Sequence, residues 1–171
     1  MSLSSFQNFN YFESHIISVL KKNFWKTIAW SCLLVGSLDI LSALTHYYIK
    51  TGKDPLNVLK YVASAVFGRD AYESGPAMAV YGLLFHYLVA FCWTILFFMI
   101  YPKFKLWSFN RIITGIVYGT IIWVIMTRVV VPLSRAVTGP FDPLQAGIAV
   151  SILIVAIGLP LSFISYRFYK R

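Results

Sequence analysis

Apolar residues along this chain gather into four long stretches, separated by segments that hold most of the charged residues. The stretches cover residues 27–48, 77–101, 112–131 and 144–165. An α-helix rises about 1.5 Å per residue, so about 20 apolar residues cross the hydrocarbon core of a bilayer. The pattern therefore predicts an all-α fold, in which four transmembrane helices form one bundle and a single integral membrane domain.

Helix-ending residues mark the boundaries of these stretches. Asp142 followed by Pro143 is typical of an N-cap and a first helical residue, and predicts the start of the fourth span. Pro102 and Pro132 follow the second and third apolar runs and predict the ends of those helices. Pro160 lies within the fourth run, where we expect it to kink the helix.

The connection between the first two stretches is long enough to hold a further helix. Apolar residues recur at helical spacing between residues 54 and 67, whereas Lys60 and Ser64 lie off that face. Gly68 follows as a stop signal. The segment predicts an amphipathic interfacial helix, which lies on the outer membrane surface or folds over the mouth of the bundle.

The segment before the first stretch also carries an apolar stripe, formed by Phe12, Ile16, Leu20 and Phe24. Two interpretations remain open for it. The segment could lie on the membrane as a surface helix, with its lysines against anionic headgroups. It could equally extend the first span into the cytoplasm.

Composition and charge exclude several classes of protein. Hydrophobic residues make up 58% of the 171 residues and charged residues only 12%, whereas a soluble domain carries about 25% charged residues. The net charge is +9, but the basic residues lie at the ends of the apolar stretches and form no single basic face. We therefore expect the lipid bilayer as a partner and no nucleic acid.

Basic residues divide unevenly between the two sides of the predicted membrane. Nine basic residues and one acid lie close before the first span, between the second and third, and after the fourth. The other two connections carry four acids against five basic residues. The positive-inside rule then places both termini and the loop 103–111 in the cytoplasm.

Four ionisable residues interrupt the apolar stretches, namely Asp39, His46, His86 and Arg128. Such residues are costly in lipid and are candidates for function. With this topology all four lie in the outer half of the membrane, and Asp39 and His86 are each roughly 14 Å below the outer end of their span. We predict a ligand-binding or proton-binding site in which Asp39 titrates, the histidines line a pocket, and Arg128 attracts an anion or anchors Asp39.

The same residues allow other interpretations. Bonds between helices that only fix the packing would explain Asp39 and the stripes of small residues near it. His46 and His86 differ in depth by roughly 10 Å, which argues against a shared haem or metal. We expect no cofactor, no metal site and no catalytic residue, because hydrolase and nucleotide-binding motifs are missing. Cys32 and Cys92 both fall in apolar stretches and predict buried, unpaired thiols.

The runs LDILSALTHYYIKTGKDPLNVLKYVASAVFG, AMAVYGLLFHYLVAFCWTILFFMIYP, TGIVYGTIIWVIMTRVVVPLS and IGLPLS carry a family resemblance. With these runs the chain after about residue 30 resembles uncharacterised small four-span bacterial membrane proteins of the YagU-like group. The resemblance implies four spans and a place in the bacterial inner (plasma) membrane. It implies no reaction and no catalytic residue.

Three functions remain compatible with the sequence. The leading interpretation is a non-enzymatic protein whose outer pocket binds or passes a small solute, a proton or a lipid headgroup, in transport or in binding. The first alternative is a membrane scaffold or accessory subunit, and the second is an enzyme that modifies lipid or quinone. Because four helices are few for a complete transport path, we also expect a homo-oligomer.

Overall fold

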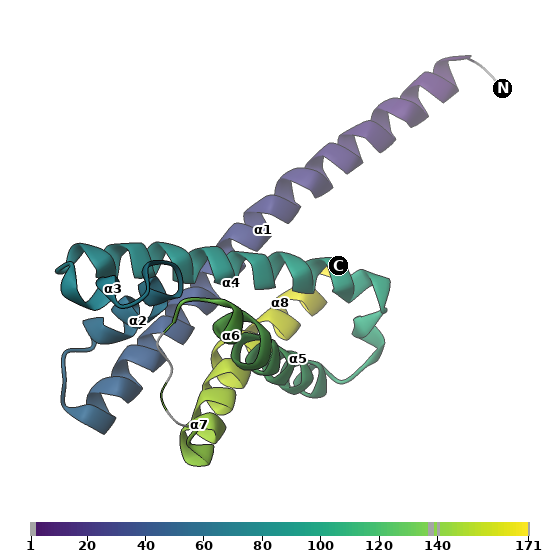
Figure 1. The fold of residues 1–171 in the computed structure, drawn as a ribbon. Coiled ribbons are helices and arrows are strands. Elements are labelled where there is room, and N and C mark those ends of the chain that lie inside the picture. The colour runs from purple at the N-terminus through teal and green to yellow at the C-terminus, as the bar shows by residue number, and fades with distance from the viewer. Residues whose placement is uncertain (1–2, 137–138, 140, 171) are drawn as a thin grey trace.

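The computed structural model describes residues 3–136, 139 and 141–170, and these residues are almost entirely helical, with no β-strand among them. Figure 1 shows the helices in chain order. Their bounds are α1 Leu3–Thr51, α2 Leu56–Phe67, α3 Asp70–Glu73, α4 Ala77–Lys103, α5 Arg111–Ile125, α6 Val131–Leu133, α7 Pro143–Leu153 and α8 Leu159–Tyr169. The remaining elements are a 3₁₀ turn, Leu106–Ser108, and two π-helical segments, Met126–Val130 and Ile154–Gly158.

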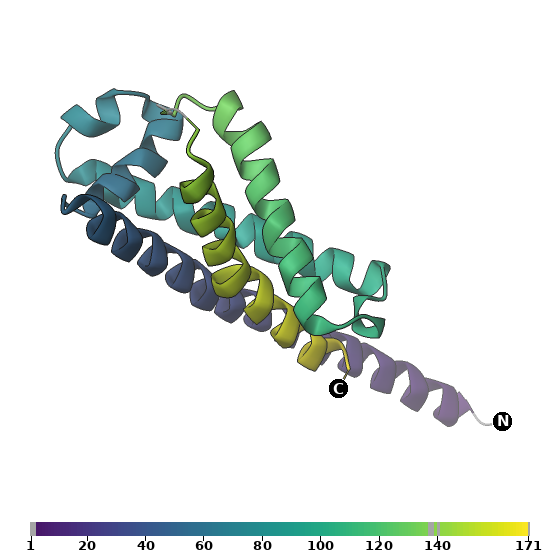
Figure 2. The same cartoon turned by 90° about the horizontal axis from the view of Figure 1, so that it is seen from below.

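Four segments are long and apolar enough to cross a membrane, which confirms the predicted helical bundle. These spans are Asn23–Thr51, Ala77–Lys103, Arg111–Leu133 and Pro143–Tyr169. The third consists of α5, a π-helical segment and α6, and the fourth of α7, a π-helical segment and α8. In Figure 2 the fourth span lies between α1 and α5, and it contacts both.

α1 is a single helix that continues well beyond the bundle. It begins at Leu3, whereas the first span begins only at Asn23. Figure 1 shows its N-terminal part, in purple, projecting away from the other helices. Close to the point where α1 leaves the bundle, the ring of Phe24 lies 6.0 Å from that of Phe168 in α8. Of the two interpretations of the N-terminal segment, the structure shows the extension of the first span.

α2, the helix between the first two spans, is folded against the bundle and packs on α4. Leu59 and Ala63 are buried in this contact. Gly82 of α4 permits the close approach, because a Cβ atom at this position would collide with the backbone carbonyl of Leu59. The ring of Phe67 lies 5.7 Å from the ring of Tyr81. The amphipathic pattern allows a helix on the membrane surface or a helix folded over the bundle, and the structure shows the second.

The second and third spans end at their prolines, as the sequence predicts. Pro102 lies inside α4 and Pro132 inside α6, and each helix ends one residue later. The π-helical segments Met126–Val130 and Ile154–Gly158 come just before Pro132 and Pro160. A proline ring clashes with the carbonyl four residues earlier, and a wider π-helical turn relieves this clash. The fourth span therefore continues as a helix through Pro160, whereas the third ends one residue after Pro132.

The third and fourth spans approach each other most closely at glycines. A Cβ atom at Gly119 would lie 2.7 Å from the Cα atom of Ile154, and one at Gly115 would lie 2.9 Å from the Cα atom of Leu159. Gly158 faces the backbone carbonyl of Gly115. Small residues let helix backbones meet in this way without a hydrophobic driving force from water.

The buried core is concentrated in the half of the bundle where α4 and α8 end. Its members come from all four spans, and the largest fully buried ones are Ile28, Phe97, Phe98, Tyr101, Ile122 and Leu161. A smaller cluster of Ile40, Leu59 and Ala79 lies in the other half, where α2 joins the bundle. Aromatic packing thus fills one half, and the other half holds Asp39, His46 and His86.

Candidate functional site

A cavity of about 370 Å³ lies between α1, α2 and α7, in the half of the bundle that contains α2. Its lining residues are Asp39, Ala43, His46, Tyr47, Lys50, Val58, Gln145, Ala149, Ile152 and Leu153. Small-molecule sites have this character, with mainly apolar walls and a few polar groups that fix the orientation of the ligand. We call this cavity the α1–α7 pocket.

One face of α1 supplies most of the polar lining. Asp39, Ala43, His46 and Lys50 recur at intervals of three and four residues, which places them on the same side of the helix. The sequence predicts a common site for Asp39 and His46, and both line this pocket. Lys50 is exposed and lies in the last turn of α1, so a cation borders the pocket at the C-terminal end of this helix.

His46 forms the polar link between the first and fourth spans. Its Nε2 atom lies 2.9 Å from Oε1 of Gln145. An amide oxygen only accepts, so Nε2–H donates in this arrangement. Gln145 is held in place because Asp142 caps α7 and its Oδ1 atom accepts from the backbone N–H of Gln145 at 3.3 Å. The structure confirms the predicted cap.

His86 lies next to the pocket but does not line it. Its Nε2 atom donates to the backbone carbonyl of Gly36 at 2.9 Å, which ties α4 to α1. Because Nε2 carries a hydrogen here, Nδ1 is the basic atom of the neutral ring. Its acceptor Gly36 precedes Asp39 by three residues on α1, so the imidazole meets α1 about one helical turn from the carboxyl group.

Asp39 is half-buried, and within the described residues its carboxyl group accepts no hydrogen bond. No basic nitrogen of those residues lies within 4.0 Å of the Asp39 carboxyl oxygens, so the group forms no ion pair with them. A carboxylate at this depth in a membrane is stable only when it is protonated, hydrated or paired with a ligand. The α1–α7 pocket is the space onto which this unpartnered group opens.

Arg128 is not part of this site, contrary to the prediction. It lies in the π-helical segment Met126–Val130, is exposed, and places its guanidinium 5.9 Å from the ring of Phe141. Phe141 precedes α7 in the connection between the third and fourth spans. This cation–π contact gives Arg128 an interfacial role near the end of its span. The structure thus brings Asp39, His46 and His86 together and leaves Arg128 apart.

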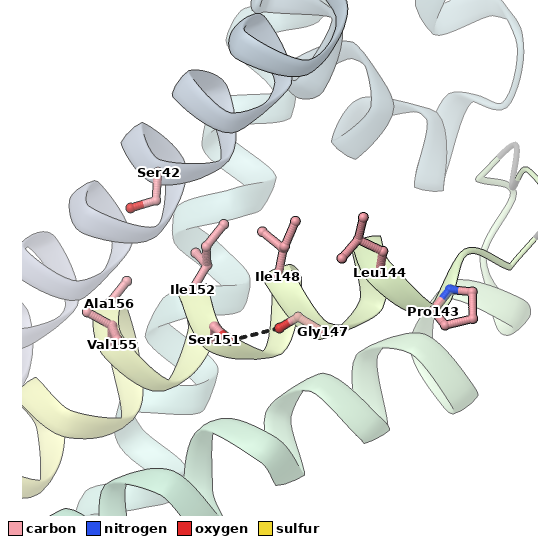
Figure 3. A pocket seen from close by; sticks show the side chains of 9 residues that line it. All are labelled: Ser42, Pro143, Leu144, Gly147, Ile148, Ser151, Ile152, Val155 and Ala156. Carbon is pink, nitrogen blue, oxygen red and sulfur yellow. Dashed lines mark hydrogen bonds between the residues drawn. The ribbon is translucent and has the colours of Figure 1, made fainter.

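A second cavity runs along the same helix, α7, and is mainly apolar. It measures about 630 Å³ and shares Ile152 with the α1–α7 pocket. In Figure 3 the side chains of Leu144, Ile148 and Ile152 project from α7 into this space, and Ser42 of α1 lies across it. The hydroxyl of Ser151 donates to the carbonyl of Gly147 at 2.9 Å and is therefore satisfied within α7. We call this cavity the apolar groove.

The cysteines differ in their surroundings, although both are free. Cys32 is buried, and its Sγ atom lies 3.8 Å from the backbone carbonyl of Tyr87. Cys92 is exposed on α4, which corrects the prediction that both thiols are buried. Among the residues that the structure describes, no group of three or more His, Cys, Asp or Glu side chains is arranged to hold a metal ion.

Gln145 is the residue of the pocket that the sequence does not single out. A glutamine in the first turn of a helix has no pattern of its own, and its partner His46 is 99 residues away in the chain. Its place three residues after the capping Asp142 is the only local signal.

Comparison with known proteins found no matching family model, no matching curated protein and no matching solved structure.

Proposed function

We propose that this integral membrane protein binds a small amphiphile, whose polar head occupies the α1–α7 pocket and whose apolar part lies in the apolar groove. The observation that carries the proposal is Asp39, a half-buried carboxyl group that opens onto a cavity and has no hydrogen-bond partner among the described residues. A ligand head that donates hydrogen bonds or carries a cation would satisfy it.

The polar groups of the pocket suit a head of this kind. Asp39 offers acceptor oxygens, and the amide nitrogen of Gln145 remains a donor while its oxygen accepts from His46. Lys50 at the border can meet an acceptor or anionic group of the same head. A zwitterionic or polyhydroxylated head meets these requirements better than a simple anion, since the deepest charged group is acidic.

The apolar groove would hold the apolar part of the ligand. Its wall is formed by aliphatic side chains of α7, among them Leu144 and Ile148, and by Val155 of the π-helical segment that follows. The groove lies next to the pocket, because Ile152 lines both. An alkyl chain laid there gains about 0.8 kcal/mol for each methylene it removes from water, but little when it comes from lipid. Selectivity would therefore come from the head, and the groove would set orientation.

The proposed topology follows from charge. The end of the bundle with the loop between α4 and α5 carries most of the basic residues, and the pocket lies toward the other end. With the basic end in the cytoplasm, the pocket faces the outer half of a plasma membrane, which in a bacterium is the inner membrane.

A scaffold or accessory subunit is the second candidate, and bonds between α1 and α4 favour it. His86 donates to Gly36 at 2.9 Å, and the hydroxyls of Ser37 and Tyr87 lie 2.7 Å apart. These contacts join two spans without any ligand. In this interpretation Asp39 and its neighbours only fix the packing of the helices.

One substitution separates the two candidates. Asp39→Asn removes the carboxylate and retains its shape, so we expect the retention of a co-extracted small molecule to fall by about ten-fold. The measurement is native mass spectrometry of protein extracted with its surrounding membrane in polymer nanodiscs. A bulky Ala149→Phe substitution, at a position that lines the pocket, should have the same effect without a change of charge.

The matched control is Asp70→Asn, at an exposed carboxyl group on α3. It should leave ligand retention unchanged. If Asp39→Asn lowers stability in detergent while the same molecules remain bound as in the unmodified protein, the pocket proposal fails and the scaffold interpretation holds.

A further inference from the structure

A separate cavity of about 430 Å³ lies at the opposite end of the bundle, between the 3₁₀ turn after α4, the start of α5 and the last turns of α8. Its lining residues are Trp107, Phe109, Asn110, Arg111, Ile112, Phe163 and Tyr166. None of them belongs to the α1–α7 pocket or the apolar groove. We call it the basic-end cavity.

Two cations share one aromatic ring beside this cavity. The guanidinium of Arg111 lies 4.3 Å from the ring centre of Tyr166 and 5.4 Å from that of Phe163. Lys170 Nζ lies 5.0 Å from the same Tyr166 ring, and it donates to the Tyr166 hydroxyl at 2.7 Å. The shared ring keeps the two positive groups close together, although like charges repel each other.

No carboxylate offsets this charge within the part of the chain whose side chains are described. The acidic residues there are Asp39, Asp54, Asp70, Glu73 and Asp142, and all lie in the outer part of the first span or in the connections at the other end. Lys103, Lys105 and Arg167 add positive charge at the ends of the second and fourth spans. The cavity thus combines unpaired cations with a concave surface.

The cavity also has an apolar side, which distinguishes it from a site for a free anion. Ile112 and Phe163 are exposed on the spans themselves, where acyl chains surround the protein. Trp107 and Tyr166 lie at the ends of the spans, the level at which these residues occupy the membrane interface. A ligand that fills the cavity meets cations, interfacial aromatic rings and lipid-facing residues.

We propose that the basic-end cavity binds an anionic phospholipid, with its phosphate against Arg111 and Lys170 and its acyl chains along Ile112 and Phe163. Each Lys or Arg near a membrane surface strengthens the binding of anionic lipid by about five-fold. The guanidinium presents several donors in a planar fork that matches a phosphate group. The site is independent of Asp39 and of the proposed amphiphile.

Native mass spectrometry of the full-length protein in nanodiscs with equal amounts of phosphatidylglycerol and phosphatidylcholine would test this proposal. We expect the unmodified chain to retain phosphatidylglycerol preferentially. Arg111→Gln and Lys170→Gln should each lower this preference by about five-fold. Arg111→Lys keeps the charge and should retain most of the preference. Lys53→Gln, at an exposed cation of the opposite end, is the matched control and should have no effect.

Three outcomes would overturn the proposal. Equal loss of preference in Lys53→Gln and Lys170→Gln would show a general effect of surface charge. Unchanged retention in Lys170→Gln, whose exposed side chain is not needed for folding, would show that the cavity does not select the lipid even if Arg111→Gln fails to fold. In a third measurement, inorganic phosphate competes with the lipid. Displacement of phosphatidylglycerol by millimolar phosphate would identify a site for free anions and not for a lipid.

Discussion

Asp39 and His86 lie at similar depth in neighbouring helices, but the protein satisfies them differently. The imidazole donates to a backbone carbonyl of α1 and so contributes to packing. The carboxyl group has no such partner among the described residues and opens onto the α1–α7 pocket. At the level of single residues, polarity within a span therefore serves two purposes, and only the geometry of the partners distinguishes them.

Gly82 gives the clearest prediction at this scale. In Gly82→Ala the new methyl group would overlap the carbonyl of Leu59, so α2 must shift away from α4. We expect the free energy of unfolding to fall by about 1–3 kcal/mol, as in other overpacked contacts. Unfolding in mixed detergent micelles would measure the change.

The control for this substitution is Gly147→Ala in α7. A Cβ atom at Gly147 meets no other group within 4 Å, and alanine is favoured over glycine in a helix by roughly 0.5–1 kcal/mol. This variant should be as stable as the original chain or more so. Equal stability of both variants would mean that α2 does not rest on α4 as described.

Individual signals in the sequence predict the local features of the site well and its distant contacts poorly. Asp142 and Pro143 mark the start of α7 because a cap and its helix are adjacent in the chain. Gln145 and Phe141, which contact His46 and Arg128, carry no comparable signal because their partners come from other spans. Depth alone placed Arg128 with Asp39, but depth does not fix the direction in which a side chain points.

At the level of elements, the third and fourth spans share a construction that the sequence shows only through its prolines. Each span contains a π-helical segment directly before its last helix, and a proline is the second residue of that helix. The glycines Gly115, Gly119 and Gly158 bring these spans together in the same region. The apolar pattern predicts each span but does not reveal the wider turns, because a π-helical turn changes the backbone path and leaves the hydropathy unchanged.

The position of α2 can be tested by cysteine labelling. In a variant with Cys32 and Cys92 replaced by alanine, Ala63→Cys should react slowly with a water-soluble maleimide, because Ala63 is fully buried against the bundle. Lys53→Cys, in the exposed turn before α2, should react quickly. Comparable rates at the two positions would indicate that α2 lies free on the membrane surface.

At the level of the whole molecule, the two ends of the bundle differ in charge and in content. One end has the basic-end cavity, an aromatic core and most of the lysines and arginines. The other has α2, the α1–α7 pocket with Asp39, and the acidic residues of the described connections. The charge pattern predicts the uneven distribution of basic and acidic residues, since it depends on the order of residues along the chain, but it does not predict the aromatic core or the basic-end cavity, which depend on contacts between spans.

This asymmetry predicts the orientation of the protein. In intact cells a membrane-impermeant maleimide should label Lys53→Cys and leave Ser108→Cys unlabelled, because the positive-inside rule places the loop between α4 and α5 in the cytoplasm. Both should be labelled after the membrane is permeabilised. Labelling of Ser108→Cys in intact cells would reverse the topology and place the α1–α7 pocket toward the cytoplasm.

The length of α1 links the interior of the membrane mechanically to the space beyond it. Its 49 residues form an unbroken rod of about 74 Å, without a proline at which it could bend. Because α1 forms one wall around Asp39, a partner that bound its projecting N-terminal part and pulled on it would tilt that wall. A force applied outside the bilayer would thereby widen or narrow the space around the carboxyl group inside it.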